Sequence, residues 1–109
     1  MIEVIDAERC TACNICVNAC PTNVFEAVPG GPPRIARQDD CQTCFMCELY
    51  CPEDALYVAP IADRSATPEE RDAAAQALMG SYRSAIGWGR GRTSTASADA
   101  SFELLRRAH

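Results

Sequence analysis

Short apolar stretches alternate with polar, glycine-rich and proline-rich segments through the first sixty residues of the chain. Stretches this short favour β-strands, because an amphipathic helix usually needs about ten residues or more. We expect strands over Ile2–Ile5, Val24–Val28, Arg34–Arg37 and Leu56–Ala59. The proline- and glycine-rich run Pro29–Pro33 predicts a turn between the second strand and the third. Short helices are expected after Cys16 and after Cys47.

Beyond residue 60 the pattern changes, and signals for the start of a helix replace the short apolar stretches. Thr67 suits the N-cap and Pro68 the first helical position, and Glu70 stands where it closes a capping box. The alanine-rich segment that follows predicts a helix over about residues 68–79, with Gly80 just past its end. The remainder is irregular, except for one or two helical turns over 102–107. We therefore divide the chain into a domain over residues 1–60 and a C-terminal extension over 61–109.

The first domain contains an internal repeat of 31 residues, which its cysteines mark. The first group is Cys10, Cys13, Cys16 and Cys20, and the second is Cys41, Cys44, Cys47 and Cys51. Proline follows the last cysteine of each group, and Phe25 in the first repeat corresponds to Leu56 in the second. Each repeat therefore predicts the same unit, a short strand, a cysteine-rich loop, a short helix and another short strand.

The spacing of these cysteines favours iron–sulfur clusters. Three cysteines at i, i+3 and i+6 in a tight loop can converge on one cluster, whereas a fourth beyond a helical turn points toward the other cluster. The spacing thus predicts that Cys10, Cys13, Cys16 and Cys51 hold cluster I, and that Cys41, Cys44, Cys47 and Cys20 hold cluster II. Zinc usually takes paired ligands, and a disulfide framework belongs in an oxidising compartment, so both alternatives fit this spacing less well. Apolar neighbours are expected to shield the clusters from water: Ile15, Val17, Phe25, Phe45 and Met46.

Residues 1–60 resemble the bacterial-type ferredoxins with two [4Fe–4S] clusters, since both cysteine motifs are complete and each ends in Cys-Pro. The resemblance implies an α+β fold in which two pseudo-symmetric βαβ-like halves surround the two clusters. It also implies an electron carrier with no catalytic residues of its own. The single histidine, His109, is the last residue of the chain, and we expect no catalytic role for it.

Charge and composition narrow the choice of partners and compartment. The chain has 109 residues and a net charge of −5, and residues 1–60 alone carry −6. A negative front half argues against binding nucleic acid and favours a partner with a positive patch. The acidic N-terminus lacks the features of a secretory signal, and no run approaches the roughly 20 apolar residues of a membrane span. We therefore expect a cytoplasmic protein that does not enter a membrane.

The C-terminal extension has few large apolar residues, and these are scattered. Ordering a residue costs about 1–2 kcal/mol, so we expect the extension not to fold alone. It can be disordered, pack on its own core or lie along a larger partner, and we favour the partner. Aromatic residues and arginine are common in protein interfaces, which makes Tyr82, Ile86, Trp88 and Arg90 the candidate partner-binding residues.

A ferredoxin-like head with a long C-terminal extension resembles the iron–sulfur small subunit of adenylylsulfate reductase and related fumarate-reductase-like flavoenzymes. That layout implies a larger subunit that carries FAD, and a hetero-oligomer in which the clusters pass single electrons to or from the flavin. Two alternatives stay open. The chain can be a free soluble ferredoxin that shuttles electrons between several enzymes, or a sensor whose clusters are structural.

Overall fold

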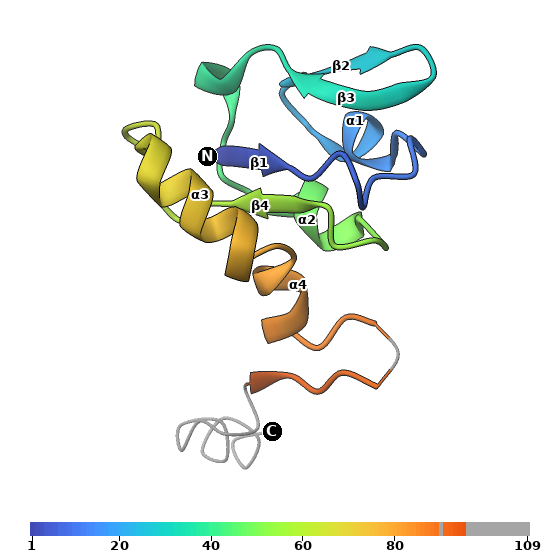
Figure 1. Cartoon of the computed structure of the whole chain (residues 1–109), viewed down its shortest axis with the longest axis vertical. Coiled ribbons are helices and arrows are strands. Elements are labelled where there is room, and N and C mark those ends of the chain that lie inside the picture. Colours follow the sequence, from blue (N-terminus) through green and yellow to red (C-terminus); the bar gives the residue numbers. More distant parts are fainter. Residues whose placement is uncertain (90, 96–109) are drawn as a thin grey trace, which may run out of the picture.

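The computed structural model describes residues 1–89 and 91–95. Two small antiparallel sheets and several short helices make up the molecule, as Figure 1 shows. In chain order the elements are β1 (Ile2–Ile5), α1 (Ile15–Ala19), β2 (Phe25–Val28), β3 (Gly31–Ile35), a short 3-10 helix (Gln38–Asp40), α2 (Met46–Tyr50), β4 (Leu56–Val58), α3 (Pro68–Ala77) and α4 (Ser81–Ala85). The predicted α+β class with short strands and helices is confirmed, and the pseudo-two-fold relation of the halves stays a prediction.

The first sheet pairs β1 with β4 and thereby joins the start of the first repeat to the end of the second. Ile2 lies opposite Val58, and Ile5 lies opposite Leu56. The core under this sheet consists of side chains that both repeats contribute: Ile2, Val24, Phe25, Cys47, Leu56 and Val58. Beside it, α1 packs against α2. The predicted bounds of β1 are confirmed, whereas β2 begins one residue later and β4 ends one residue earlier than predicted.

The second sheet, β2 with β3, differs from the prediction at its turn. The turn consists of Pro29 and Gly30 alone, and β3 runs over Gly31–Ile35 instead of Arg34–Arg37. Two prolines, Pro32 and Pro33, therefore lie within the strand. The reason is the size of the sheet. In a two-stranded sheet both strands are edges, and an edge strand tolerates proline wherever its missing N–H would face away from the partner.

Left-handed backbone recurs in the two cysteine-rich repeats. Among the residues that the structure describes, six other than glycine have a positive φ, between 52° and 62°: Ala12, Asn14 and Asn23 in the first repeat, and Thr43, Phe45 and Asp54 in the second. Each residue of the first set lies 31 positions before one of the second. Such a backbone costs roughly 1–2 kcal/mol for a residue that is not glycine. The two repeats therefore share one strained loop conformation.

The helix predicted in the C-terminal extension is present as α3. Its N-cap is confirmed, because the Glu70 N–H donates to the Thr67 hydroxyl oxygen at 3.2 Å. It ends at Ala77, two residues before the predicted end, and α4 follows in a segment predicted to be irregular. Gly80 lies between the two helices with φ +70°. No helix in the described ranges is long and apolar enough to cross a membrane.

The start of the extension packs on β1. Ala74 of α3 is buried, and the α3 face that carries it lies against this strand. The buried carboxylate of Glu3 accepts a hydrogen bond from the Ala66 N–H and lies 3.6 Å from the Arg71 Nε atom. Farther along, the Gly80 N–H donates to the Leu56 carbonyl at 3.0 Å. The core thus supplies hydrogen-bond acceptors to the extension.

The second part of the extension packs on α2 through Glu48, which is completely buried. One carboxylate oxygen accepts the N–H of Tyr82 at 2.7 Å and of Arg83 at 3.3 Å, at the start of α4. The other oxygen accepts the Val58 N–H at 2.9 Å. We expected this segment to need a partner in order to fold. In the structure its described residues pack on their own core instead, because buried carboxylates of the core satisfy their backbone N–H groups. The boundary near residue 60 stays a prediction.

Candidate metal centres

Four cysteines line one cavity beside β4, which we call cavity I. They are Cys10, Cys13, Cys16 and Cys51. Apolar side chains complete most of its wall, among them Ile5, Ile15, Pro33 and Leu56. Three of the cysteines come from the first repeat and one from the second, which is the grouping that the spacing predicted.

The other four cysteines line a second cavity, cavity II. They are Cys41, Cys44, Cys47 and Cys20, and here the single cysteine comes from the first repeat. The wall is again mainly apolar and includes Ile2, Phe25, Phe45 and Val58. Phe25 and Phe45 of the expected shielding set therefore line cavity II, and Ile15 lines cavity I.

The two short helices explain why each repeat reaches both cavities. Cys16 lies within α1 and lines cavity I, whereas Cys20 directly follows α1 and lines cavity II. In the second repeat Cys47 lies within α2 and lines cavity II, and Cys51 directly follows α2 and lines cavity I. Because α1 packs against α2, each helix holds one cysteine at each cavity.

Backbone N–H groups point at the cysteine sulfurs in both repeats. The Ala12 N–H donates to Cys10 Sγ and the Thr43 N–H to Cys41 Sγ, both at 3.4 Å. The Val24 N–H donates to Cys20 Sγ and the Ala55 N–H to Cys51 Sγ, again at 3.4 Å. Donors of this kind stabilise negative charge on sulfur and thereby tune a metal centre. The left-handed residues of the loops, Ala12 and Thr43 among them, bring these donors into place.

Burial acts on the thiols in the opposite direction. It raises the pKa of Cys16 to about 11, and it raises the pKa of Cys47 as well. At Cys20 burial also raises the pKa, but the Val24 N–H and the Thr22 groups outweigh it, so the pKa of this thiol is lowered. Metal ligation takes the deprotonated sulfur, so binding at the two buried thiols must displace a proton.

The residues present fit sulfur-ligated clusters. All eight cysteines are free thiols, and they lie around two cavities that N–H donors and apolar side chains complete. Within residues 1–89 and 91–95, no three His, Cys, Asp or Glu side chains form a group that would hold a single metal ion. Each cavity has four cysteines in its wall, which is the number of thiolate ligands that a [4Fe–4S] cluster takes.

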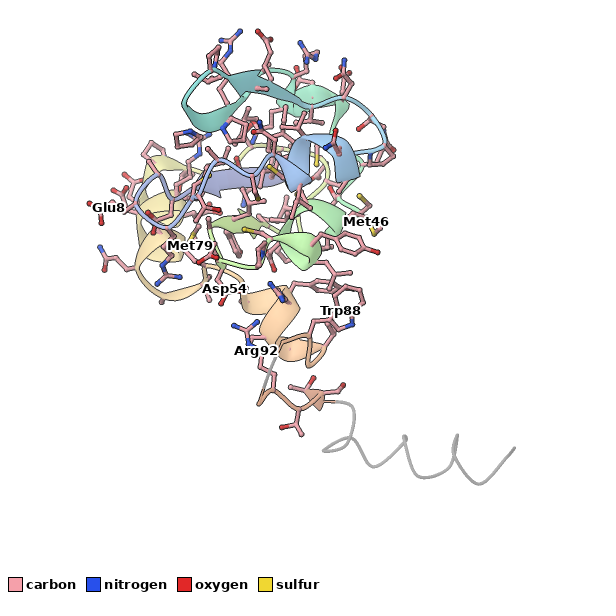
Figure 2. The ribbon with its side chains drawn as sticks, turned by 90° about the vertical axis from the view of Figure 1, so that its right-hand side faces the viewer. Glu8, Met46, Asp54, Met79, Trp88 and Arg92 are labelled. Atoms are coloured by element: carbon pink, nitrogen blue, oxygen red, sulfur yellow. The ribbon has the colours of Figure 1, made fainter. Side chains whose placement is uncertain are left out.

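Two of the predicted partner-binding residues, Tyr82 and Trp88, contact α2 or its N-cap residue. The Tyr82 ring stacks on Phe45, with 4.4 Å between the ring centroids. Trp88 makes an edge contact with Tyr50 at 5.4 Å and is 42% exposed (Figure 2). Ile86 is partly buried. Arg90 lies outside the described residues. Tyr82 therefore covers a wall residue of cavity II, and only Trp88 among the described three has a large exposed surface.

Two residues near the cavities were missed in the sequence. Glu48 stands between Cys47 and Leu49, and nothing in its neighbourhood indicates that two of its hydrogen-bond donors, Tyr82 and Arg83, lie more than thirty residues away. Burial raises its pKa, against the opposing effect of the three N–H groups that it accepts. Arg83 donates from its guanidinium to the carbonyl of Cys51. Both contacts depend on where α4 lies, and the local pattern did not predict that helix.

The comparisons with known proteins agree with this geometry. Residues 9–56, which include all eight cysteines, match the family described as 4Fe-4S dicluster domain. A ferredoxin of Methanothermococcus thermolithotrophicus is 45% identical over 56 residues, which is 50% of this chain and 92% of that protein. An uncharacterized ferredoxin of Methanocaldococcus jannaschii is 44% identical over 62 residues, 55% of this chain and 98% of that protein.

A shorter match joins the chain to the ferredoxin-type protein NapF of Escherichia coli, with 38% identity over 46 residues, 41% of this chain and 28% of that protein. No solved structure matches the chain. The first two relatives are covered almost completely, and the family match includes every cysteine. The chain therefore belongs to the [4Fe–4S] ferredoxins, and it is an iron–sulfur electron carrier.

Proposed function

We propose that this chain carries single electrons on two [4Fe–4S] clusters. Cys10, Cys13, Cys16 and Cys51 hold one, and Cys41, Cys44, Cys47 and Cys20 hold the other. The observation that carries the proposal is the division of the eight cysteines, four to each of two cavities. When bound, the clusters supply one-electron redox chemistry. The chain supplies the ligands, the N–H donors that stabilise charge on sulfur, and apolar walls that limit the access of water.

Iron analysis and spectroscopy test the number of clusters. We expect about eight iron and eight sulfide per chain, and two magnetically coupled reduced clusters in the EPR spectrum of the dithionite-treated protein. Four or fewer irons per chain in freshly purified anaerobic protein would contradict the proposal.

We further propose that the electrons pass to or from the flavin of a larger FAD-containing subunit, in a hetero-oligomer. Two features support this partner. Residues 1–60 carry a net charge of −6, which suits a partner with a positive patch. Trp88 is a large exposed aromatic residue that contacts Tyr50, the residue just before Cys51.

Purification from the native source tests the partner. We expect flavin and a second polypeptide to co-purify with the chain, and we expect Trp88→Ala to weaken their retention without changing the iron content. Arg64→Ala, at an exposed position distant from Trp88 in the chain, is the matched control. A chain that elutes alone and without flavin would argue for the alternative.

The alternative is a free soluble ferredoxin that shuttles electrons between several enzymes, and one observation favours it. The described part of the extension packs on its own core, so its fold needs no partner there. In that case the purified chain is a monomer in gel filtration at all concentrations, and it reduces several unrelated acceptor enzymes at comparable rates.

A further inference from the structure

The 31-residue repeat pairs most wall residues of cavity I with wall residues of cavity II. Two of these pairs differ in the hydrogen bond that they make to a cysteine sulfur. Pro33 in cavity I corresponds to Ile2 in cavity II. Glu53 in cavity I corresponds to Thr22 in cavity II. In both pairs the residue with the donor lies at cavity II.

The pair Ile2 and Pro33 differs at the backbone. Both residues are buried, and the Ile2 N–H donates to Cys41 Sγ at 3.4 Å. Pro33 occupies the corresponding place for Cys10 but has no N–H to donate. Cys41 therefore accepts two backbone donors, from Ile2 and Thr43, whereas within the described residues Cys10 accepts one, from Ala12.

The pair Thr22 and Glu53 differs in the side chain. The Thr22 hydroxyl oxygen lies 3.7 Å from Cys20 Sγ, within hydrogen-bond distance for sulfur. The ionised carboxylate of Glu53 cannot donate, and its negative charge disfavours a further negative charge nearby. Glu53 is exposed, so solvent screens this charge, and its contribution is smaller than that of the backbone donor.

Two groups act in the opposite direction. The side-chain amide of Asn14 lines cavity I, where the corresponding residue of cavity II is Phe45, but none of the hydrogen bonds to sulfur among the described residues comes from it. The Arg83 guanidinium donates to the Cys51 carbonyl and places a positive charge near cavity I. Its contact is with a main-chain oxygen rather than with a sulfur. The difference in hydrogen-bond donors to sulfur therefore decides which of the two sites has the higher reduction potential.

An added electron makes a cluster more negative, and donors to its sulfurs stabilise that charge. From these differences we infer that the two sites have unequal reduction potentials, and that the first electron enters cavity II. The inference rests on the proposed function, since it needs a cluster in each cavity. Ile2 and Thr22 raise the potential of the site in cavity II, and Pro33 and Glu53 lower that of the site in cavity I. The electron comes from an external reductant such as dithionite, and no proton transfer is required.

A redox titration of the full-length loaded protein tests the inference. At half reduction, the shifted NMR signals of the cysteine β-protons show which ligand set carries the electron. We expect it on the Cys41 set in at least ten times as many molecules as on the Cys10 set, which for a one-electron couple is a difference of about 59 mV. Equal occupancy, or preference for the Cys10 set, would overturn the inference and leave the two-cluster proposal standing. A protein with a single cluster would overturn both.

Two variants assign the difference to the residues named. Thr22→Val removes the hydroxyl donor and should lower the potential of the Cys41 set alone. Pro33→Ile restores an N–H opposite Cys10 and should raise the potential of the Cys10 set alone. Both changes should reduce the difference between the reduction potentials of the two sites. Glu69→Gln, which removes a carboxylate that lines neither cavity, is the control. We expect it to leave the difference between the two potentials unchanged. If Thr22→Val leaves the difference between the two potentials unchanged while the iron content is complete, Thr22 does not contribute to that difference. The same reasoning applies to Pro33 and the Pro33→Ile variant.

Discussion

Two buried carboxylates, Glu3 and Glu48, connect the cysteine-rich core to the segment that follows it. Glu48 is 0% exposed and faces no cation within hydrogen-bond distance in the described ranges, and its carboxylate accepts hydrogen bonds from three backbone N–H groups. Leaving a buried donor without an acceptor costs about 1–3 kcal/mol, which makes such a residue costly to replace. At the scale of single residues, the position of α4 therefore depends on Glu48.

Replacement of Glu48 should destabilise the protein and release α4. We expect Glu48→Ala to lower the free energy of unfolding by about 3 kcal/mol, because three N–H groups lose their acceptor, and Glu48→Gln by about half as much, because one oxygen remains. Denaturant unfolding followed by Trp88 fluorescence measures both. Glu69→Gln, at an exposed site in the first turn of α3, is the control, with a change below about 1 kcal/mol. Equal stability of Glu48→Ala and the parent chain would contradict this role.

Cys51 belongs to the second repeat in sequence but lines the cavity of the first. We therefore expect Cys51→Ala to remove or convert the cluster at Cys10, Cys13 and Cys16 and to leave the one at Cys41, Cys44 and Cys47 in place. The lost ligand also joins the halves, so the stability of both should fall. Iron content and the cysteine NMR signals measure the outcome. Loss of the Cys41 signals with retention of the Cys10 signals would argue against the crossing.

At the scale of elements, local signals predicted what depends on local chemistry. Thr67 and Pro68 correctly predicted the start of α3, and the apolar stretch Ile2–Ile5 correctly predicted β1. The cysteine spacing gave the grouping around each cavity. The prolines of β3 were misleading, because whether a strand lies at an edge depends on how many strands its sheet has. The helix α4 was missed, because a carboxylate 34 residues away, on α2, caps it.

The stacking of Tyr82 on Phe45 gives α4 a second role, as a cover over the wall of cavity II. Tyr82→Ala should lower the free energy of unfolding by about 2 kcal/mol, because a stacked aromatic pair and buried area are lost. It should also accelerate cluster loss in air, which the decay of the visible absorbance measures. Tyr82→Phe retains the ring and should behave like the parent chain. If Tyr82→Ala bleaches no faster than Tyr82→Phe, the cover has no protective effect.

At the scale of the whole molecule, the eight cysteines do what a larger apolar core does in other domains. Among the described residues, the largest fully buried side chains are Ile2, Leu56, Glu48 and Val24, and only three of these are apolar. Each cavity takes cysteines from both repeats, so under the proposed function a cluster at either one would hold the halves together. The extension in turn depends on Glu3 and Glu48, which lie in those halves.

Removal of iron should therefore unfold the extension together with the core. We expect anaerobic chelation to abolish the visible absorbance, the helical circular dichroism and the folded-state Trp88 fluorescence in one transition, because structure and ligation are linked. If the folded-state fluorescence of Trp88 persists after the visible absorbance is lost, the extension stays folded independently of the clusters.

The close approach of Gly80 to Asp54 has a consequence for how the sequence can vary. A Cβ atom at position 80 would lie 2.5 Å from the Asp54 carboxylate, and the backbone there has φ +70°. Asp54 is itself held by Arg92 at 2.5 Å, so it cannot easily move aside. Positions 54, 80 and 92 are therefore expected to vary together among homologues. Homologues that keep this extension should retain glycine at 80 wherever an acidic residue stands at 54. Homologues without the extension need no acidic residue at 54, although the left-handed backbone there still favours asparagine, aspartate or glycine.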